Sequence, residues 1–215
     1  MVTHYIHRGL AKKSFKENTL SAFKYSFKKK CGIETDLQVT KDNQLICFHD
    51  FNLRRRFNLN KNVKDINYSI LKKISKKREA TVPLLKDLLK ISKNKYPLLL
   101  EIKPLLTKIS LLNLIKLIKK TKKYGIISFK EKNLINLYKI NKKLPLGLLF
   151  LSTASFKNIK IKSKKKYVKF LVLEKKFLSN KNLHLIRKKI YYYTIKNKNL
   201  FKKYRNTKNL IFEKI

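Results

Sequence analysis

The chain has 215 residues, and its 43% hydrophobic and 11% aromatic content is enough to bury the core of one ordinary domain. That composition excludes an intrinsically disordered chain, and the cysteine count, only Cys31 and Cys47, excludes a disulfide scaffold or a CxxC zinc site. The formal net charge is +43, from 55 Lys and Arg residues against 12 Asp and Glu residues.

Two explanations of the basic charge stay open. The charge could attract an anionic partner, such as nucleic acid or a phospholipid surface. It could also reflect compositional drift, because Lys, Asn, Ile, Phe and Tyr are abundant, as an AT-rich coding sequence would produce, while Gly, Pro and Trp are scarce. The lysines are also spread along the chain and are not gathered in one tail, as on a solvated basic surface.

The first residues of the chain, and the length of its apolar runs, bear on where in the cell the protein works. Residues 1–8 contain no apolar stretch of the kind found in signal peptides, and no apolar run reaches ~18 residues. We therefore expect no signal peptide, no transmembrane helix, reduced cysteines and a cytoplasmic enzyme.

Short apolar segments alternate with longer amphipathic segments, a pattern that predicts βα units around a parallel sheet. The expected strands are 3–7, 32–37, 97–102, 124–128, 146–151, 168–173, 190–195 and 209–212. The expected helices are 19–29, 82–91, 109–120, 132–140, 182–188 and 199–204, and a short hairpin joins 37–40 to 44–48.

Eight βα units predict an α/β fold, a single TIM (β/α)8 barrel, with residues 1–215 as one domain. We expect the barrel to be reduced in its C-terminal half. Residues 152–166 are Lys-rich and only weakly helical in pattern, and the chain ends at Ile215, directly after the last expected strand. That leaves no room for a closing helix.

Acidic side chains stand at the expected carboxyl ends of two strands, where TIM barrels carry their functional groups. Because side chains alternate between strand faces, Glu34 and Asp36 share one face, and so do Glu101 and Lys103. Neighbouring strands would then bring three carboxylates together, and a hard divalent cation, Mg²⁺ or Ca²⁺, is the usual remedy for their repulsion. A merely exposed strand end is the alternative for Glu-x-Asp, but three of only 12 acids at such places favour a metal site.

Histidines and cations complete the expected site. His7 and His49 are candidates for general acid and base, because imidazole titrates near neutral pH. His4 has the opposite strand parity and should face helices or solvent. Arg8 offers a planar fork and Lys103 a point charge, both suited to phosphate oxygens. The remaining histidine, His184, lies among lysines, and we expect it to be exposed.

Together these motifs resemble the glycerophosphodiester phosphodiesterase family. In chain order they are His7-Arg8-Gly9, Glu17-Asn18-Thr19-Leu20-x-Ala22-Phe23, Gly32-Ile33-Glu34-Thr35-Asp36-Leu37-Gln38-Val39-Thr40-Lys41-Asp42, His49-Asp50-x-x-Leu53-x-Arg55, Val82-Pro83-x-Leu85 and Glu101-Ile102-Lys103. The second half is similar more faintly, through Ser128-Phe129 and through 193–197, where Tyr193 replaces a family Trp. Residues 212–214, Phe-Glu-Lys, depart from the family's Thr-Asp-x-Pro ending.

The resemblance implies a TIM barrel that uses one divalent cation to cleave glycerophosphodiesters into an alcohol and glycerol 3-phosphate. The cation would be bound by Glu34, Asp36 and Glu101, with His7 and His49 as the acid–base pair and Arg8 and Lys103 on the phosphate. Glu17 would lie close by, orienting Arg8 or touching the metal. For Glu17 and Asn18, an N-cap role before the helix at Thr19 is the alternative.

Other functions remain open beside this one. A lysophospholipase D-like enzyme would use the same site on membrane lipids, with possible peripheral contact between its basic surface and an anionic membrane. A nucleic-acid-binding protein would need a concentrated basic face with stacking aromatic side chains. Strand alternation would split the tyrosines at 191–193 between faces, so nucleic acid is the less favoured partner.

Overall fold

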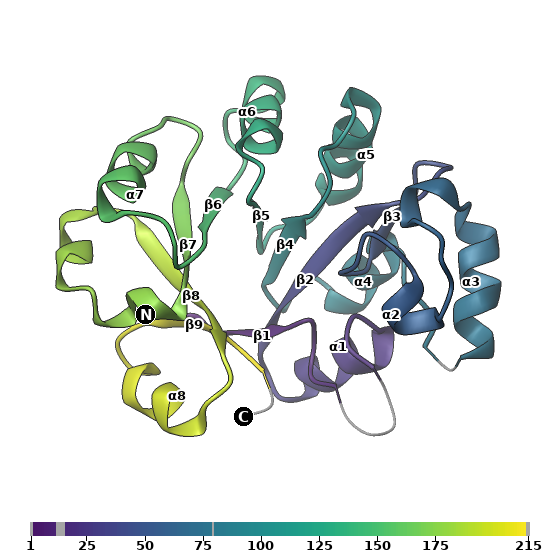
Figure 1. The fold of residues 1–215 in the computed structure, drawn as a ribbon, viewed down its shortest axis with the longest axis horizontal. Coiled ribbons are helices and arrows are strands. Elements are labelled where there is room, and N and C mark those ends of the chain that lie inside the picture. Colours follow the sequence, from purple (N-terminus) through teal and green to yellow (C-terminus); the bar gives the residue numbers. More distant parts are fainter. Residues whose placement is uncertain (1, 12–15, 79, 214–215) are drawn as a thin grey trace.

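The computed structural model describes residues 2–11, 16–78 and 80–213, and it contains a closed barrel of eight parallel strands with helices between them (Figure 1). The barrel strands are β1 (Tyr5–His7), β2 (Gly32–Val39), β4 (Leu98–Ile102), β5 (Tyr124–Ser128), β6 (Leu146–Phe150), β7 (Phe170–Glu174), β8 (Lys189–Ile195) and β9 (Asn209–Phe212). The barrel closes because β1 pairs with both β2 and β9. All eight expected strands are confirmed, since short apolar runs buried on both faces suit a parallel sheet.

The expected hairpin is also present. Strand β3 (Leu45–Cys47) pairs antiparallel with the far end of β2, and Leu37 lies opposite Cys47. After β3 the chain forms α2 (Arg54–Phe57), a 3-10 turn η1 (Val63–Asp65) and α3 (Tyr68–Lys77), which lie to one side of the barrel in Figure 1. This excursion, not foreseen as helical, has its own small apolar core, formed by Phe48, Phe57, Leu71, Val82 and their neighbours.

Most of the expected helices are confirmed. They are α1 (Leu20–Lys28), α4 (Leu85–Ser92), α5 (Lys108–Ile118), α6 (Glu131–Ile140) and α8 (Lys198–Tyr204). The weakly helical segment holds α7 (Phe156–Ser163), so the C-terminal helices α7 and α8 are short, as expected, but present. Among the described residues, every helix is too short or too polar to cross a bilayer.

The prediction of a helix at 182–188 is wrong. The fully described connection between β7 and β8 instead contains two 3-10 turns, η2 (Lys175–Ser179) and η3 (Lys181–Leu185). Asn180 caps the second turn, because its side-chain oxygen accepts a hydrogen bond from the Asn182 amide at 3.0 Å. Leu183 and Ile186, three residues apart, are the buried side chains, and a spacing of three suits a 3-10 turn as well as a helix.

The barrel interior is filled with apolar side chains below the carboxyl ends of the strands. They are Tyr5, Leu99, Ile127, Leu149, Phe170, Val172, Tyr191 and Ile211. The Phe170 ring lies over two glycines of neighbouring strands. A Cβ atom at Gly147 would overlap this ring, and one at Gly125 would lie 2.9 Å from its Cζ atom. The lack of a side chain at Gly125 and Gly147 therefore makes room for the Phe170 ring in the barrel interior.

Gly147→Ala should lower the free energy of unfolding by about 1–3 kcal/mol, because the added methyl group overpacks the barrel against Phe170. Chemical denaturation would measure the change. Gly147→Ala combined with Phe170→Leu should recover most of the loss, since the smaller side chain vacates the contested space. A single variant as stable as the wild type would contradict this packing.

Candidate active site

The carboxyl ends of β2 and β4 bring three carboxylates together in the mouth of the barrel. Asp36 pairs in register with Glu101, and Glu34 lies two residues before Asp36 on the same strand face. One oxygen of each residue lies within 4.8 Å of those of the other two, and all three residues are buried. Strand parity thus placed these side chains correctly.

Crowding and burial affect the three acids differently. Burial and then the charges of Asp36 and Glu101 raise the pKa of Glu34 well above its usual value. Burial and then Asp36 raise the pKa of Glu101 to about 7. Burial also opposes ionisation of Asp36, but the positive charges around it outweigh burial and lower its pKa. The site therefore holds its charge unevenly, with Asp36 as the most acidic member.

A divalent cation fits this donor set. Glu34 Oε2 is buried and accepts no hydrogen bond from the part of the chain that the structure describes. Three carboxylate groups offer the oxygen ligands that Mg²⁺ and Ca²⁺ prefer. The triad could therefore hold a metal ion.

Two cations lie against the acidic triad. Arg8 Nε is 3.0 Å from Asp36 Oδ2, and Lys103 Nζ is 2.9 Å from Glu101 Oε1 and 3.7 Å from Asp36 Oδ1. Arg8 follows β1 with a positive φ of 55°, which bends the chain so that the side chain turns across to β2. The structure thus brings both predicted phosphate-binding cations to the triad.

Asn18 also belongs to this site, although the sequence suggested only a possible cap. Its side-chain amide donates to Asp36 Oδ2 at 3.0 Å, and its carbonyl oxygen accepts from the Thr35 hydroxyl at 2.7 Å. Thr19 is the residue that caps α1, by accepting from the Ala22 amide. The N-cap alternative for Glu17 and Asn18 is therefore wrong, and Asn18 instead fixes the orientation of Asp36.

His7 is hydrogen-bonded to an acid that the sequence did not mark as functional. Its Nδ1 lies 2.7 Å from Glu213 Oε2, and its Nε2 lies 3.9 Å from Glu34 Oε2. Glu213 follows β9, and its other oxygen lies 2.8 Å from Lys196 Nζ, just past β8. The hydrogen bond to His7 is the main cause that lowers the pKa of Glu213 to about 2. The sequence offered one signal that Glu213 could be functional: it stands directly after the eighth barrel strand in a chain with few acids.

His49 has a carboxylate partner as well. Its Nδ1 lies 2.7 Å from Asp50 Oδ1, and Arg55 Nε donates to Asp50 Oδ2 at 2.7 Å. Arg55 also donates to Glu17 Oε1 at 2.8 Å, and Arg8 lies 3.3 Å from the same oxygen. Glu17 thus contacts Arg8, in keeping with the orienting role considered for it. The resulting chain of contacts ties the His49 turn to the Arg8 turn.

The other two histidines lie away from the triad. The His4 ring packs 5.6 Å from the Phe201 ring of α8, on the helix side of the sheet, as its parity predicted. His184 is exposed in η3.

Side chains of the later strands line the mouth beside the triad. The Tyr193 hydroxyl donates to the Phe150 carbonyl at 3.0 Å, and the Phe129 ring meets the Tyr193 ring edge-on, 6.2 Å between centroids. Ser128, which precedes Phe129, donates to the Ile102 carbonyl at 2.8 Å and so links β5 to β4. The faint second-half motifs therefore shape the mouth.

A sequence model of the glycerophosphoryl diester phosphodiesterase family matches residues 7–207. This span includes the acidic triad, His7, His49 and the residues that contact them, except Glu213. The chain belongs to this family.

Individual relatives agree with the family assignment. A glycerophosphodiester phosphodiesterase of Bacillus altitudinis is 35% identical over 99 residues, which are 42% of this chain and 40% of that protein. The human lysophospholipase D GDPD1 is 39% identical over 66 residues, 30% of this chain and 21% of that protein. The matches thus span less than half the length of these curated relatives.

Solved structures of low sequence identity share the fold. A glycerophosphodiester phosphodiesterase of Thermotoga maritima superposes with a TM-score of 0.85 at 22% identity, over 99% of this chain and 94% of that one. A phosphodiesterase of Oleispira antarctica, in complex with the product sn-glycerol-3-phosphate, gives a TM-score of 0.82 at 18% identity, over 98% of this chain and 92% of that one.

Cation binding to this family site should release protons and strengthen as the pH rises through about 7, because Glu101 and Glu34 must ionise to become ligands. Calorimetric titration with Mg²⁺ or Ca²⁺ at pH 6.5 and 8, in buffers of different ionisation enthalpy, would measure both effects. Glu34→Gln should abolish binding, whereas Asp65→Asn, an exposed acid outside the triad, should leave it unchanged. Binding that survives Glu34→Gln would refute the triad as the cation site.

Proposed function

We propose that this chain is a metal-dependent phosphoric diester hydrolase that converts glycerophosphodiesters into an alcohol and glycerol 3-phosphate. The observation that carries the proposal is the pair of histidine–carboxylate contacts, His7–Glu213 and His49–Asp50, in the mouth that holds the acidic triad. Two imidazoles beside one cation site suit a reaction that takes one proton and gives another. The names of the family and of its relatives support the same chemistry.

Each histidine is oriented by its acid. A carboxylate on Nδ1 holds a proton there and leaves Nε2 free to act on the substrate. In our proposal one Nε2 accepts the proton of the nucleophile, either water or the glycerol hydroxyl next to the phosphate. Attack by that hydroxyl forms a cyclic phosphate, which a water molecule then opens to glycerol 3-phosphate. The other donates a proton to the departing alcohol oxygen. Which histidine takes which part follows from the side on which the alcohol leaves.

The basic residues at the triad would bind the substrate phosphate. Arg8 and Lys103 lie next to Asp36 and Glu101, so a phosphate held at the triad would be within reach of both. A bound Mg²⁺ or Ca²⁺, held by Glu34, Asp36 and Glu101, would neutralise the charge that develops on the phosphate oxygens. Arg8 would keep its direction through Glu17, which contacts its Nη1 atom, while Asp36 contacts its Nε atom.

A lysophospholipid is the second candidate substrate. The match to a lysophospholipase D over 66 residues favours it, as does the apolar character of part of the barrel mouth. A nucleic-acid role is not favoured, because Tyr191 and Tyr192 are buried and the Tyr193 hydroxyl is bonded to Phe150.

We propose further that residues 1–215 act as one catalytic domain. Because Cys31 and Cys47 are unpaired, we also propose that the protein works in a reducing compartment such as the cytoplasm.

His7→Ala and His49→Ala should each lower kcat/KM for glycerophosphocholine by about 100- to 10,000-fold, the usual contribution of a general acid or base. Phosphorus NMR of turnover with added Mg²⁺ or Ca²⁺, repeated after chelation, would follow substrate and product directly. His184→Ala is the control, because this exposed histidine lies away from the mouth. Undiminished turnover by either of the first two variants would remove that residue from the acid–base pair.

Glu213→Gln should lower kcat by about 10- to 100-fold with little change in KM, because the carboxylate orients His7 without touching the substrate. Steady-state kinetics on glycerophosphocholine would separate the two constants. Glu131→Gln provides the matched control, since Glu131 is also ion-paired to a lysine, Lys162 at 2.7 Å, but contacts no histidine. Equal effects of the two substitutions would mean that Glu213 is only structural.

A further inference from the structure

Large apolar side chains stand exposed around one side of the barrel mouth. We define the apolar rim as four exposed residues that follow four strands on the same side of the barrel: Phe51, Leu105, Phe129 and Leu151. Phe51 comes soon after β3, and the other three lie just past β4, β5 and β6. Because β3, β2, β4, β5 and β6 are successive neighbours in the sheet, the rim forms one continuous arc. Clustered apolar side chains of this kind mark an interaction surface.

A hollow of about 560 Å³ lies within this arc, next to the proposed catalytic turn. Phe51 and Leu105 line it together with Lys64 and Lys130. Gln38 is also part of its lining, and the Gln38 side chain donates hydrogen bonds to the carbonyls of His49 and Asp50. One residue of the hollow's lining therefore contacts the turn that carries His49.

Basic side chains surround the rim. The exposed cations that follow the same strand ends, or lie close in sequence to them, are Arg54, Lys61, Lys64, Lys108, Lys130, Lys175 and Lys176. The acids nearby are already engaged: Asp65 accepts a hydrogen bond from Asn62, and Glu131 pairs with Lys162. The mouth therefore presents apolar tips within a positively charged border.

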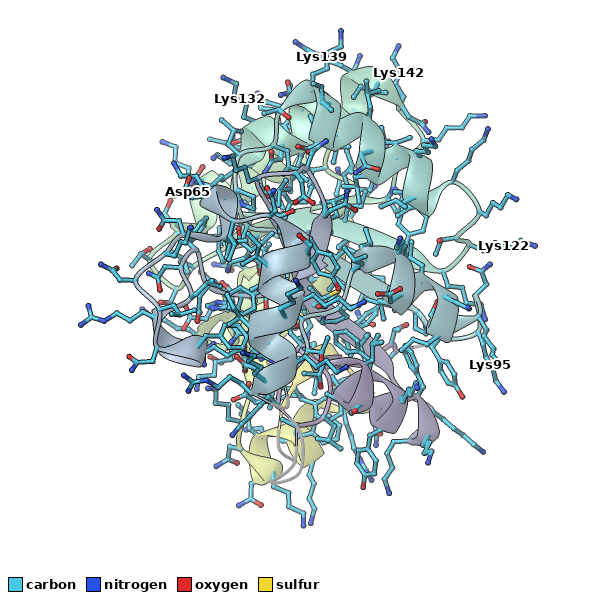
Figure 2. All side chains as sticks on the ribbon, turned by 90° about the vertical axis from the view of Figure 1, so that its right-hand side faces the viewer. Asp65, Lys95, Lys122, Lys132, Lys139 and Lys142 are labelled. Carbon is cyan, nitrogen blue, oxygen red and sulfur yellow. The ribbon has the colours of Figure 1, made fainter. Side chains whose placement is uncertain are left out.

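The charge alone does not select this face. Figure 2 shows Lys132, Lys139 and Lys142 projecting outward around α6, and Lys95 and Lys122 extending at another edge of the molecule. Positive charge on many sides attracts an anionic surface without orienting the protein on it. Apolar tips that gather at the mouth supply the missing direction, because a face with clustered exposed apolar side chains gains more from leaving water than a face with single ones.

We propose that the apolar rim docks the barrel mouth on an anionic lipid bilayer. Phe and Leu tips would enter the boundary between headgroups and acyl chains, while the bordering lysines would pair with lipid phosphates. The inference rests on the proposed phosphodiesterase function, because docking turns that active site toward the phosphodiester headgroups. A lipid surface explains both the aliphatic tips and the cations, whereas nucleic acid would leave the leucines unused.

The test compares two double variants that remove equal amounts of exposed apolar surface. Leu105 and Leu151 of the rim are 50% and 53% exposed, and Ile161 and Leu185 are 53% and 51% exposed. Ile161 lies in the last turn of α7, and Leu185 precedes the start of β8, so both lie toward the amino ends of the strands. Co-sedimentation would use vesicles of phosphatidylglycerol with phosphatidylcholine, and vesicles of phosphatidylcholine alone.

The wild type should bind the anionic vesicles at low salt and bind the neutral ones far less. Leu105→Ser with Leu151→Ser should lower the partition coefficient about tenfold, since two inserted side chains lose most of their apolar area. Ile161→Ser with Leu185→Ser should change it by less than about twofold. Absence of wild-type binding, or an equal loss in both double variants, would overturn the proposal.

Two further measurements separate the possible failures. Rim-dependent dimerisation without lipid, seen by light scattering and lost in the rim variant, would make this face a contact between copies of the chain and would overturn the lipid proposal. Turnover of water-soluble glycerophosphocholine should be unchanged in the rim variant. Rim-dependent vesicle binding without any wild-type turnover would refute the phosphodiesterase function and leave the docking, whereas turnover without rim-dependent binding would refute the docking alone.

Discussion

Mutual repulsion among Glu34, Asp36 and Glu101 is the constraint around which the mouth of this barrel is built. Strand pairing holds Asp36 beside Glu101 in register, so the backbone keeps the three acidic residues next to one another. The surroundings respond to that charge: Arg8 and Lys103 approach it from neighbouring strand ends. They compensate only part of it, since burial, and then the neighbouring carboxylates, keep the pKa of Glu34 and Glu101 raised. A divalent cation is the ligand whose charge and oxygen preference fit what is left.

Much of this was predictable because it depends on local rules. Alternation along a strand placed Glu34, Asp36, Glu101 and Lys103 on inner faces and separated His7 from His4, and apolar runs located the eight strands. The misses involve information that is not local. Glu213 meets His7 across 206 positions of sequence, and only the closing of the barrel brings them together. In the segment 182–188 the two buried residues, Leu183 and Ile186, are three positions apart, a spacing that suits a 3-10 turn as well as a helix.

The two halves of the chain contribute differently to the site. The first half carries the triad, both candidate histidines and the cations that would bind phosphate. The second half closes the barrel, and where β9 meets β1 it supplies the acid that holds His7. His49 reaches the mouth by another route, on the excursion that follows β3. The two imidazoles thus depend on separate parts of the fold, so their mutual arrangement is a property of the closed barrel.

The scarcity of acids has a consequence for how this sequence tolerates change. Of its 12 acidic residues, six lie in the network around the mouth: Glu17, Glu34, Asp36, Asp50, Glu101 and Glu213. Each of the six contacts at least one arginine, lysine or histidine side chain, or belongs to the triad. Exchanging one surface lysine for another polar residue changes the net charge of the protein by a small fraction. Losing one of these acids leaves the basic groups around it without their acidic partner. We therefore expect substitutions of these six acids to be tolerated less well than substitutions of surface lysines, and half of the acids in this basic chain lie at its candidate active site.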